Sequence, residues 1–311
     1  MTRRGIILFA ALGLIWGIPY LFVKIAVAEL TPEFLVLARA GLAALILLPI
    51  AALGGAIMPV LRRWKPLLAF AFVEMLLPWY FLNSAEVNLP SSTTGLLLSA
   101  VPLVAVGVAL AFGRRDRITA VNWVGIAIGM LGVGTIVGLD LGGSDLASVA
   151  MLSVVVLGYA VGPAILARWM SDLPPVGVVA LALTISSVLI LPVVAVTGGW
   201  PTAVPSPPTI LSVVILAVVC SALAFVLMFA LIAEIGPIRM TAITYVNPAV
   251  AVVAGALVLS EPITIWTLVG FGLILVGCTL VTRPDRRTAV HVGAAQQPGE
   301  QPAEPAKTSR T

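Results

Sequence analysis

Three charged side chains lie inside long apolar runs of this sequence and are the first candidates for chemistry: Lys24, Arg39 and Glu74. A charge at the centre of a lipid bilayer costs about 2.5–3.5 kcal/mol, so a charged residue in such a run tends to have a specific role. Glu74 lies near the middle of its run. It can carry a proton or bind a cationic group, or it can form a structural ion pair with Lys24 or Arg39. Lys24 and Arg39 lie nearer the ends of their runs, where they can bind a carboxylate or extend toward lipid head groups.

Aromatic and polar side chains accompany these charges. Trp16, Tyr20 and Lys24 recur every four residues, so they share one face of a helix. Most of the seven tryptophans fall near the ends of apolar runs, as interfacial aromatics do, but Trp16 and Trp79 do not. Packing inside a helix bundle is the alternative for each aromatic. If a small molecule crosses the bilayer through this protein, the residues predicted to line its pathway are the charged, aromatic and polar ones within the runs. They are Trp16, Tyr20, Lys24, Arg39, Glu74, Trp79, Tyr80, Tyr159, Tyr245 and Asn247.

Prolines and glycines within the runs predict where helices bend and where they approach closely. Pro19, Pro102, Pro163 and Pro248 are expected to kink their helices, and a kink can act as a hinge or be purely structural. Small residues that recur along a helix suit close helix packing in a membrane. Two runs carry such a set: Gly125, Gly129 and Gly132 on one, and Gly270 and Gly277 on the other.

Composition indicates the setting in which these residues act. Of the 311 residues, 60% are hydrophobic and 10% are charged, whereas soluble domains have about 45–50% apolar and about 25% charged residues. We therefore expect a lipid bilayer as partner, and no soluble enzyme, nucleic-acid-binding protein or disordered scaffold. Cys220 and Cys278 lie in apolar runs and the single histidine, His291, lies in a polar tail, so no disulfide, metal or cofactor is expected. No catalytic motif or pair of intramembrane acids is present either.

The apolar runs have the length that a membrane-spanning helix needs, which is about 20 residues. Helix is the expected conformation, because a helix satisfies its own backbone in lipid. Ala26-Val27-Ala28 resembles a signal-peptidase site, but cleavage there would remove a run that has a partner in the second half of the chain. The ten predicted spans are 5–27, 34–56, 66–85, 93–113, 118–139, 146–168, 176–197, 209–233, 240–260 and 263–282.

Basic residues predict the orientation of these spans, because they favour cytoplasmic loops. Of the 17 lysines and arginines, all except Lys24 and Arg39 fall at the N-terminus, in alternate loops or in the C-terminal tail. The other loops carry acids instead. We therefore expect both termini on the cytoplasmic side of a bacterial plasma membrane. The acids assigned to the outer loops are Glu29, Glu33, Glu86, Asp140, Asp145 and Glu261.

The two halves of the sequence resemble each other when one is shifted by about 145 residues. Pro102 then falls on Pro248, and Gly125 falls on Gly270. Each half holds five spans, so the halves must cross the membrane in opposite directions. The predicted fold is thus an all-α integral membrane protein with ten transmembrane helices in two inverted five-helix repeats. The predicted domains are a first repeat over 1–140, a second repeat over 141–283 and a disordered cytosolic tail over 284–311.

Several short motifs, each weak alone, fall in the spans where one family carries them. Trp16-Gly17 precedes Lys24 in the first span, and the entry to the second is Thr31-Pro32-Glu33. The strongest stretch runs through Gly236-Pro237, Tyr245-Val246-Asn247-Pro248 and Leu259-Ser260-Glu261-Pro262-Ile263-Thr264. In this pattern the chain resembles the EamA family of the drug/metabolite transporter superfamily over about residues 5–282.

The resemblance implies a secondary carrier, most often an exporter of small metabolites, amino acids or drugs. Inverted repeats of this kind bind substrate between their halves and expose it alternately to each side. The acidic residue that small multidrug resistance relatives carry in the first span is absent here, which leaves proton-independent facilitated transport open. Uptake by the same fold is a further alternative. A membrane-embedded enzyme is an alternative of a different class, as is a receptor or scaffold without transport. We expect a small-molecule substrate and a functional monomer, although a dimer is possible.

Overall fold

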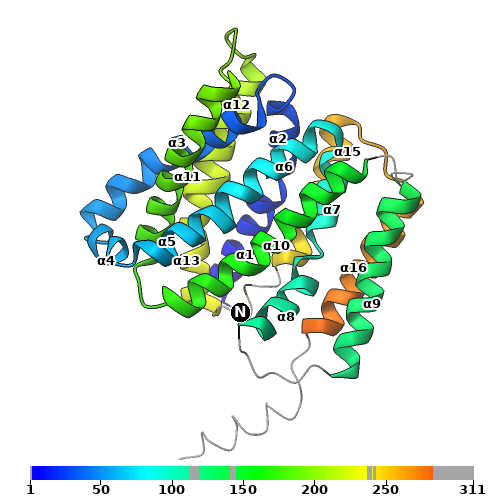
Figure 1. The fold of residues 1–311 in the computed structure, drawn as a ribbon. Helices are drawn as coiled ribbons and strands as arrows, with labels where there is room; N and C mark the ends of the chain where they lie inside the picture. Colours follow the sequence, from blue (N-terminus) through cyan, green and yellow to red (C-terminus); the bar gives the residue numbers. More distant parts are fainter. Residues whose placement is uncertain (1, 113–118, 141–144, 237–239, 241–242, 283–311) are drawn as a thin grey trace, which may run out of the picture. The chain divides into compact units, whose positions relative to one another are not determined.

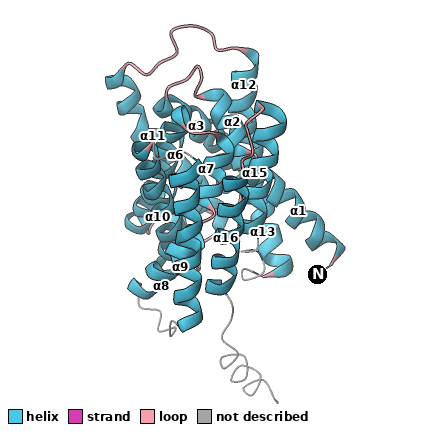
Figure 2. Cartoon of the chain, turned by 90° about the vertical axis from the view of Figure 1, so that its right-hand side faces the viewer, coloured by secondary structure: helices cyan, strands magenta, loops and turns pink. Residues whose placement is uncertain are grey.

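The computed structural model describes residues 2–112, 119–140, 145–236, 240 and 243–282. In these residues every regular element is a helix and no strand occurs (Figures 1 and 2). Residues up to Val281 form one compact unit. The tail predicted over 284–311 lies outside the described residues. The all-helical fold class is therefore confirmed for the part of the chain that is described.

The helices of the first half follow one another with short breaks. They are α1 (Arg3–Gly17), α2 (Pro19–Ala26), α3 (Pro32–Leu53), α4 (Ile57–Leu61), α5 (Trp64–Phe70), the π-helical η1 (Ala71–Leu76), α6 (Leu77–Asn88), α7 (Ser91–Leu98), α8 (Val101–Ala111), α9 (Ala120–Thr135) and the π-helical η2 (Ile136–Asp140).

The described helices of the second half also follow one another with short breaks. Its helices are α10 (Leu146–Trp169), α11 (Pro175–Thr197), α12 (Pro207–Val214), the π-helical η3 (Ile215–Leu223), α13 (Ala224–Ile235), α15 (Ile243–Leu259) and α16 (Ile265–Thr282).

Eight helical stretches in the described residues are long and apolar enough to cross a membrane. The two shorter apolar helices are Ile243–Leu259 and Ile265–Val281. Each predicted span coincides with one of these stretches, with ends that differ by a few residues. A helical membrane protein is confirmed, whereas ten crossings in two inverted repeats stay a prediction.

The third helical stretch extends further than the sequence indicated, and this corrects the predicted position of Glu86. The helical stretch runs over Trp64–Asn88, so Glu86, predicted in an outer loop, lies within α6 and is fully buried. Polar residues near Asn83 lower the hydropathy there and imitate a loop. The helix stops only before Pro90, because a proline disfavours helical geometry in the residue that precedes it. Glu33, also predicted in a loop, is buried in the first turn of α3.

The four prolines have different surroundings. A bend at Ile18 separates α1 from α2 directly before Pro19. A turn at residues 99–100 separates α7 from α8 before Pro102. Pro163 lies inside the continuous helix α10, and Pro248 lies inside α15. Proline therefore coincides with a helix break at two of the four positions, and a hinge role for any of them stays a prediction.

The most extensive helix contacts join elements that lie far apart in the sequence. α3 packs along α11, α6 along α10 and α7 along α15 (Figure 1). Thr31 at the start of α3 donates a hydrogen bond to the carbonyl of Gly199 after the end of α11, over 3.0 Å, so these two helices are antiparallel. Between α3 and α11 lies a hydrophobic core that includes Val36, Leu47 and Leu183.

Glycines set the contact between α9 and α16, which lie side by side in both views (Figures 1 and 2). A Cβ atom on Gly132 would lie 2.6 Å from the carbonyl oxygen of Gly270. A Cβ atom on Gly277 would lie 2.5 Å from the carbonyl oxygen of Gly125. The two backbones thus approach as closely as the small-residue pattern predicted, and that prediction is confirmed.

Candidate functional site

Arg39 is the centre of a polar cluster inside the helical unit. It lies two turns into α3, a helix that begins where the Thr31 side chain accepts a hydrogen bond from the backbone of Phe34. The side chain is buried, and its Nε donates to the Ser221 hydroxyl over 3.0 Å. Its guanidinium carbon stands 3.8 Å from the centroid of the Trp79 ring. Arg39 therefore connects α3 with α6 and with the π-helical η3.

The contacts of Arg39 leave the two terminal nitrogens of its guanidinium group free to donate hydrogen bonds. Ser221 itself donates to the carbonyl of Leu216, over 2.8 Å, which fixes the hydroxyl within η3. The two terminal nitrogens of Arg39 have no hydrogen-bond partner among the described residues. A guanidinium binds a carboxylate best through two parallel N–H donors. Arg39 is thus held by its Nε and by the Trp79 ring, with its terminal fork free to bind an anion.

Two predicted tyrosines belong to the same cluster. Tyr20 on α2 and Tyr159 on α10 are half-buried and lie close enough to Arg39 to interact with its charge. The structure therefore brings together four of the predicted pathway residues, from four different elements. Ser221 and Cys220, which also lies within range of Arg39, were not predicted. No sequence signal identified them, because Ser and Cys are common in apolar helices.

Glu74 lies in η1, where it packs against α10. A Cβ atom at Gly162 would lie 2.0 Å from its Oε2 atom, so glycine at that position gives the carboxyl group its space. Oε2 is buried without a hydrogen-bond partner. The structural ion pair with Lys24 or Arg39, considered as the alternative for Glu74, does not form among the described residues. In that part of the chain the one salt bridge joins Arg63 and Asp172.

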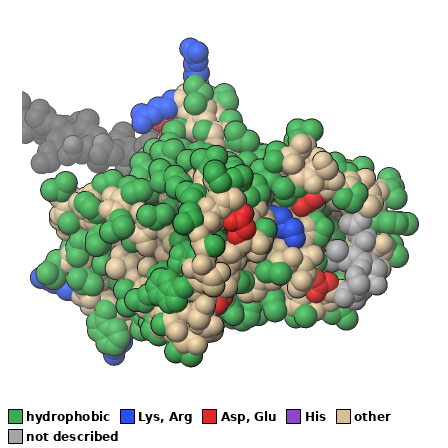
Figure 3. All heavy atoms as spheres, turned by 90° about the horizontal axis from the view of Figure 1, so that it is seen from above, with side chains coloured by type: hydrophobic (Ala, Val, Ile, Leu, Met, Phe, Trp, Pro, Cys, Tyr) green, Lys and Arg blue, Asp and Glu red, His purple; other side chains and the backbone are tan. Residues whose placement is uncertain are grey.

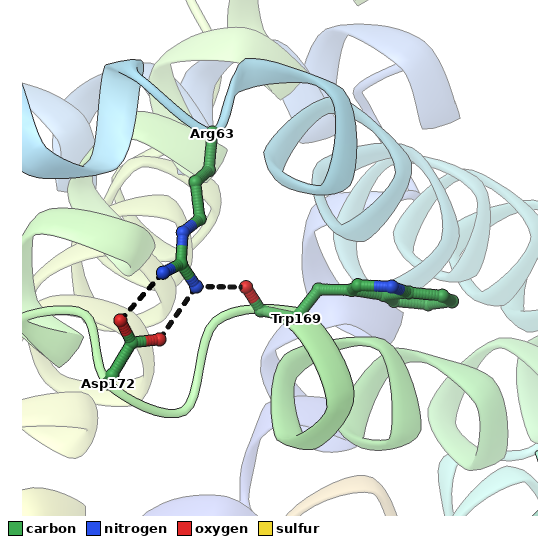
Figure 4. A network of polar contacts seen from close by, with 3 residues as sticks. All are labelled: Arg63, Trp169 and Asp172. Atoms are coloured by element: carbon green, nitrogen blue, oxygen red, sulfur yellow. Dashed lines mark hydrogen bonds and ion pairs between the residues drawn. The ribbon is translucent and has the colours of Figure 1, made fainter.

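That salt bridge lies at the end of the molecule where basic loops were predicted, and it links the two halves of the sequence (Figure 4). Arg63 makes a bidentate contact with Asp172, with both N–O distances 2.7 Å. It also donates to the backbone carbonyl of Trp169 over 2.6 Å. Hydrogen bonding from Arg63 lowers the pKa of Asp172 below its ordinary value. Both side chains are exposed, so this pair is separate from the Arg39 cluster.

Lys24 caps the end of α6. Its Nζ donates to the backbone carbonyl of Glu86 over 2.7 Å and to that of Val87 over 3.3 Å. The last carbonyls of a helix have no intrahelical partner, and a cation near them is also favoured by the helix dipole.

Seen from the end that is uppermost in Figure 1, acidic side chains occur in several places with basic side-chain atoms among them (Figure 3).

Four other predicted residues make contacts outside this cluster, within or between helices. Trp16 meets Phe225 edge to face, with ring centroids 6.3 Å apart. Tyr80 meets the neighbouring Phe81 in the same way, at 5.4 Å. In the amide orientation that satisfies its neighbours, the Asn247 nitrogen donates to the carbonyl oxygens of Gly13 and Ile243, each over 3.1 Å, which connects α15 to α1. Tyr245 is half-buried against the hydrophobic core.

Glu261, from the strongest motif, has a structural role at the start of α7. Its carboxylate accepts hydrogen bonds from the backbone N–H groups of Ser91, over 2.7 Å, and of Ser92, over 2.9 Å. It thereby caps the first turn of α7, where a negative charge is also favoured by the helix dipole. The motif in the second half thus fixes a helix of the first half.

Groups of three or more metal-ligating side chains are absent among the described residues. The groups that the Arg39 cluster does bring together are a cationic fork, aromatic rings and hydroxyl groups.

Comparison with known proteins identifies the family. The sequence profile of the EamA-like transporter family matches residues 3–138 and, a second time, residues 146–283. The uncharacterized inner membrane transporter YedA of Escherichia coli is 30% identical over 279 residues, which cover 88% of each chain. The uncharacterized transporter YvbV of Bacillus subtilis is 25% identical over 93% of this chain and 95% of its own.

A solved crystal structure shares the fold. It superposes with a TM-score of 0.65 at 18% identity and covers 90% of this chain and 98% of its own. The resemblance drawn from the sequence motifs is confirmed by the family match over both halves. The chain is a membrane protein that belongs to the EamA-like transporter family.

Proposed function

We propose that this protein is a secondary transporter that exports small metabolites, amino acids or drugs across a bacterial plasma membrane, and that Arg39 binds an anionic group of the substrate. The observation that carries the proposal is a buried guanidinium with no carboxylate in ion-pair distance among the described residues. A buried charge without a counterion is unfavourable by several kcal/mol. A substrate carboxylate would supply the missing charge.

The surroundings of Arg39 favour a substrate that also has an apolar part. Trp79, Tyr20 and Tyr159 present large rings around the guanidinium. Pockets for small molecules combine such rings with few polar groups that fix orientation. A small organic acid or an amino acid meets both requirements, and a drug with an acidic group does so as well.

Alternating access between two inverted repeats is the mechanism we infer. The family profile matches the chain twice, once in each half. Helices that correspond under the shift of about 145 residues also have corresponding neighbours: α1 packs on α15, and α10 packs on α8. Near-equivalent packing of this kind is what an exchange between inward-facing and outward-facing arrangements requires. A single chain holds both halves, so we infer a functional monomer.

The orientation we propose places both termini in the cytoplasm. Contacts among loops support it: the basic segments near Arg63 and Arg168 lie at one end, where Arg168 donates to the carbonyl of Phe112. Acidic Glu29 lies in a loop that contacts Ser206, next to the contact between Thr31 and Gly199. A reporter fused after Thr311 should read cytoplasmic, and a periplasmic signal would contradict this topology.

The experiment that tests the proposed function is an untargeted mass-spectrometric comparison of culture medium. Cells that express the native chain are compared with cells that express an Arg39→Gln variant at equal membrane abundance. An anionic or zwitterionic metabolite enriched outside only with the native chain would support export through Arg39. Accumulation inside the cells would indicate uptake by the same fold. Equal metabolite profiles would contradict the role of Arg39.

A further inference from the structure

Glu86 is the most enclosed carboxyl group that the structure describes. Its residue is 0% exposed, and neither carboxylate oxygen has a hydrogen-bond partner among the described residues. Glu74, on the same span, is only half-buried, and one of its carboxylate oxygens, Oε2, is a buried atom without a partner among the described residues. Glu86 is therefore unlike the carboxylates of Glu33 and Glu261, whose oxygens accept hydrogen bonds.

Charged and titratable groups face Glu86 from several elements. Lys24 on α2, Arg39 on α3 and Glu261 before α16 interact with it electrostatically, and so do Tyr20 and Tyr159. The two cations have other hydrogen-bond partners. Arg39 bonds to Ser221, and Lys24 bonds to backbone carbonyls. No cation lies in ion-pair distance of the Glu86 carboxyl group in the described part of the chain.

The hydrogen bond of Lys24 to the backbone of Glu86 bears on the charge of the Glu86 side chain. Its ammonium group binds the backbone oxygen of Glu86, at 2.7 Å, and not the side chain. A flexible lysine close to an ionised carboxylate would be expected to pair with it, since the attraction between opposite charges is strong away from water. The observed contact fits a carboxyl group that carries no charge.

A proton on Glu86 resolves this arrangement. The neutral acid avoids the several kcal/mol that an unpaired buried charge costs, and it gains an O–H donor. Asn83 lies one turn earlier on the same side of α6, is 1% exposed, and has an amide oxygen without a donor. A neutral Glu86 thus brings a donor to a region with unsatisfied acceptors.

We propose that Glu86 is a reversible proton-binding site and that Lys24 is the cation that replaces the proton. In the arrangement described here the proton is bound and Lys24 caps α6. When the O–H bond breaks and the proton passes to water, Lys24 leaves the carbonyls of Glu86 and Val87 and pairs with the carboxylate. In neither state does Glu86 carry an unpaired negative charge, because the carboxyl group holds either the proton or Lys24. The net charge of the two side chains falls from +1 to 0 as the proton leaves, and the change loosens the contact between α2 and α6. The inference rests on the proposed function only in assigning the proton a part in transport.

Infrared difference spectroscopy tests the site without any transported solute. The purified full-length chain, in vesicles of phosphatidylcholine and phosphatidylglycerol, is titrated in potassium buffer, and the C=O stretch of protonated carboxylic acids is followed. The band lost at alkaline pH should include a component that is absent from Glu86→Gln and present in the matched variant Glu74→Gln. Glu86→Asp should shift this component and not remove it, which covers the case in which the glutamine variant fails to fold.

Three results would overturn the proposal. Equal band loss in the native chain and in Glu86→Gln would mean that Glu86 does not titrate. Loss of the component when sodium replaces potassium at constant pH would assign a sodium site. An unchanged pH dependence in Lys24→Gln would exclude Lys24 as the replacing cation. Because no substrate is needed, failure here would leave the export proposal intact, and a failed export assay would not remove the band.

Discussion

The pair α9–α16 and the cluster around Arg39 are built on opposite principles. In the most apolar 18-residue part of the span over Ala120–Leu139, 22% of the residues are buried. In the corresponding part of the span over Trp64–Asn88, the stretch that carries Glu74, Trp79 and Glu86, the share is 50%. Close backbone contacts at glycines hold α9 to α16. The Arg39 cluster is held by a few side-chain contacts, and acceptors near it have no donors.

This difference teaches where movement can occur. At the four glycines the two backbones are in contact with no side chain of their own that could adopt another rotamer, so we expect α9 and α16 to move together. Charged groups with incomplete partners can exchange them at small cost, because a better contact compensates for the one that is lost. We therefore expect the third span to take part in substrate binding and release, and the pair α9–α16 to act as a support.

The largest effect is expected for Gly132→Ala. The new Cβ atom would lie 2.6 Å from the Gly270 carbonyl oxygen and 2.8 Å from the Ile274 backbone nitrogen, and neither can rotate away. Overpacking of this kind costs about 1–3 kcal/mol. Thermal unfolding in detergent, followed by fluorescence-detected size exclusion, should show a clear loss of stability. The matched control is Gly134→Ala, whose Cβ atom would meet nothing within 4 Å. Equal stability of both variants would show that the close approach is not needed.

A smaller but specific effect is expected for Arg39→Lys. Lysine keeps the charge but loses the planar fork and the stacking on Trp79. We expect export of the substrate found in the medium comparison to fall at least tenfold, which corresponds to about 1.4 kcal/mol. Membrane abundance should remain normal. The control Arg168→Lys changes an exposed arginine of α10, and comparable losses in both variants would argue against a binding role.

A loss of stability smaller than that of Gly132→Ala is expected for Glu261→Ala. The variant leaves the N–H groups of Ser91 and Ser92 without their acceptor. Loss of a helix cap costs about 0.5–2 kcal/mol. Glu261→Gln retains one acceptor oxygen and should be less affected in the same unfolding assay. A glutamine variant as unstable as the alanine variant would mean that the charge matters more than the hydrogen bonds.

The parts of the fold that the sequence predicted are those that depend on periodic chemistry. Long apolar runs predicted the helices, and the spacing of Gly125 and Gly132 predicted a close helix contact. Arg39 was predicted because a charge in an apolar run is conspicuous. Its partner Ser221 was not, since a serine in a membrane helix has no distinctive signal.

Glu86 shows where sequence reasoning failed and why. Hydropathy averages over a window, so the polar residues around Asn83 ended the predicted span too early. Burial there depends on tertiary packing of α6 against α10 and on Lys24, which is distant in sequence. Pro90 was the better local signal, because it marks where the helix must stop.

The smallest effect is expected at the exposed ion pair of Arg63 and Asp172, and its pH dependence distinguishes a real contribution from none. The hydrogen bonds from Arg63 lower the pKa of Asp172 in the folded state. The stabilisation is therefore present above the ordinary value of about 3.9 and is lost as the pH falls through the lowered value. Asp172→Asn should unfold slightly earlier than the native chain at neutral pH, and the difference should vanish in strong acid. In strong acid the Asp172 carboxyl group of the native chain is neutral in the folded and in the unfolded state. A difference in stability that persists there would have to come from the packing of the loop after α10.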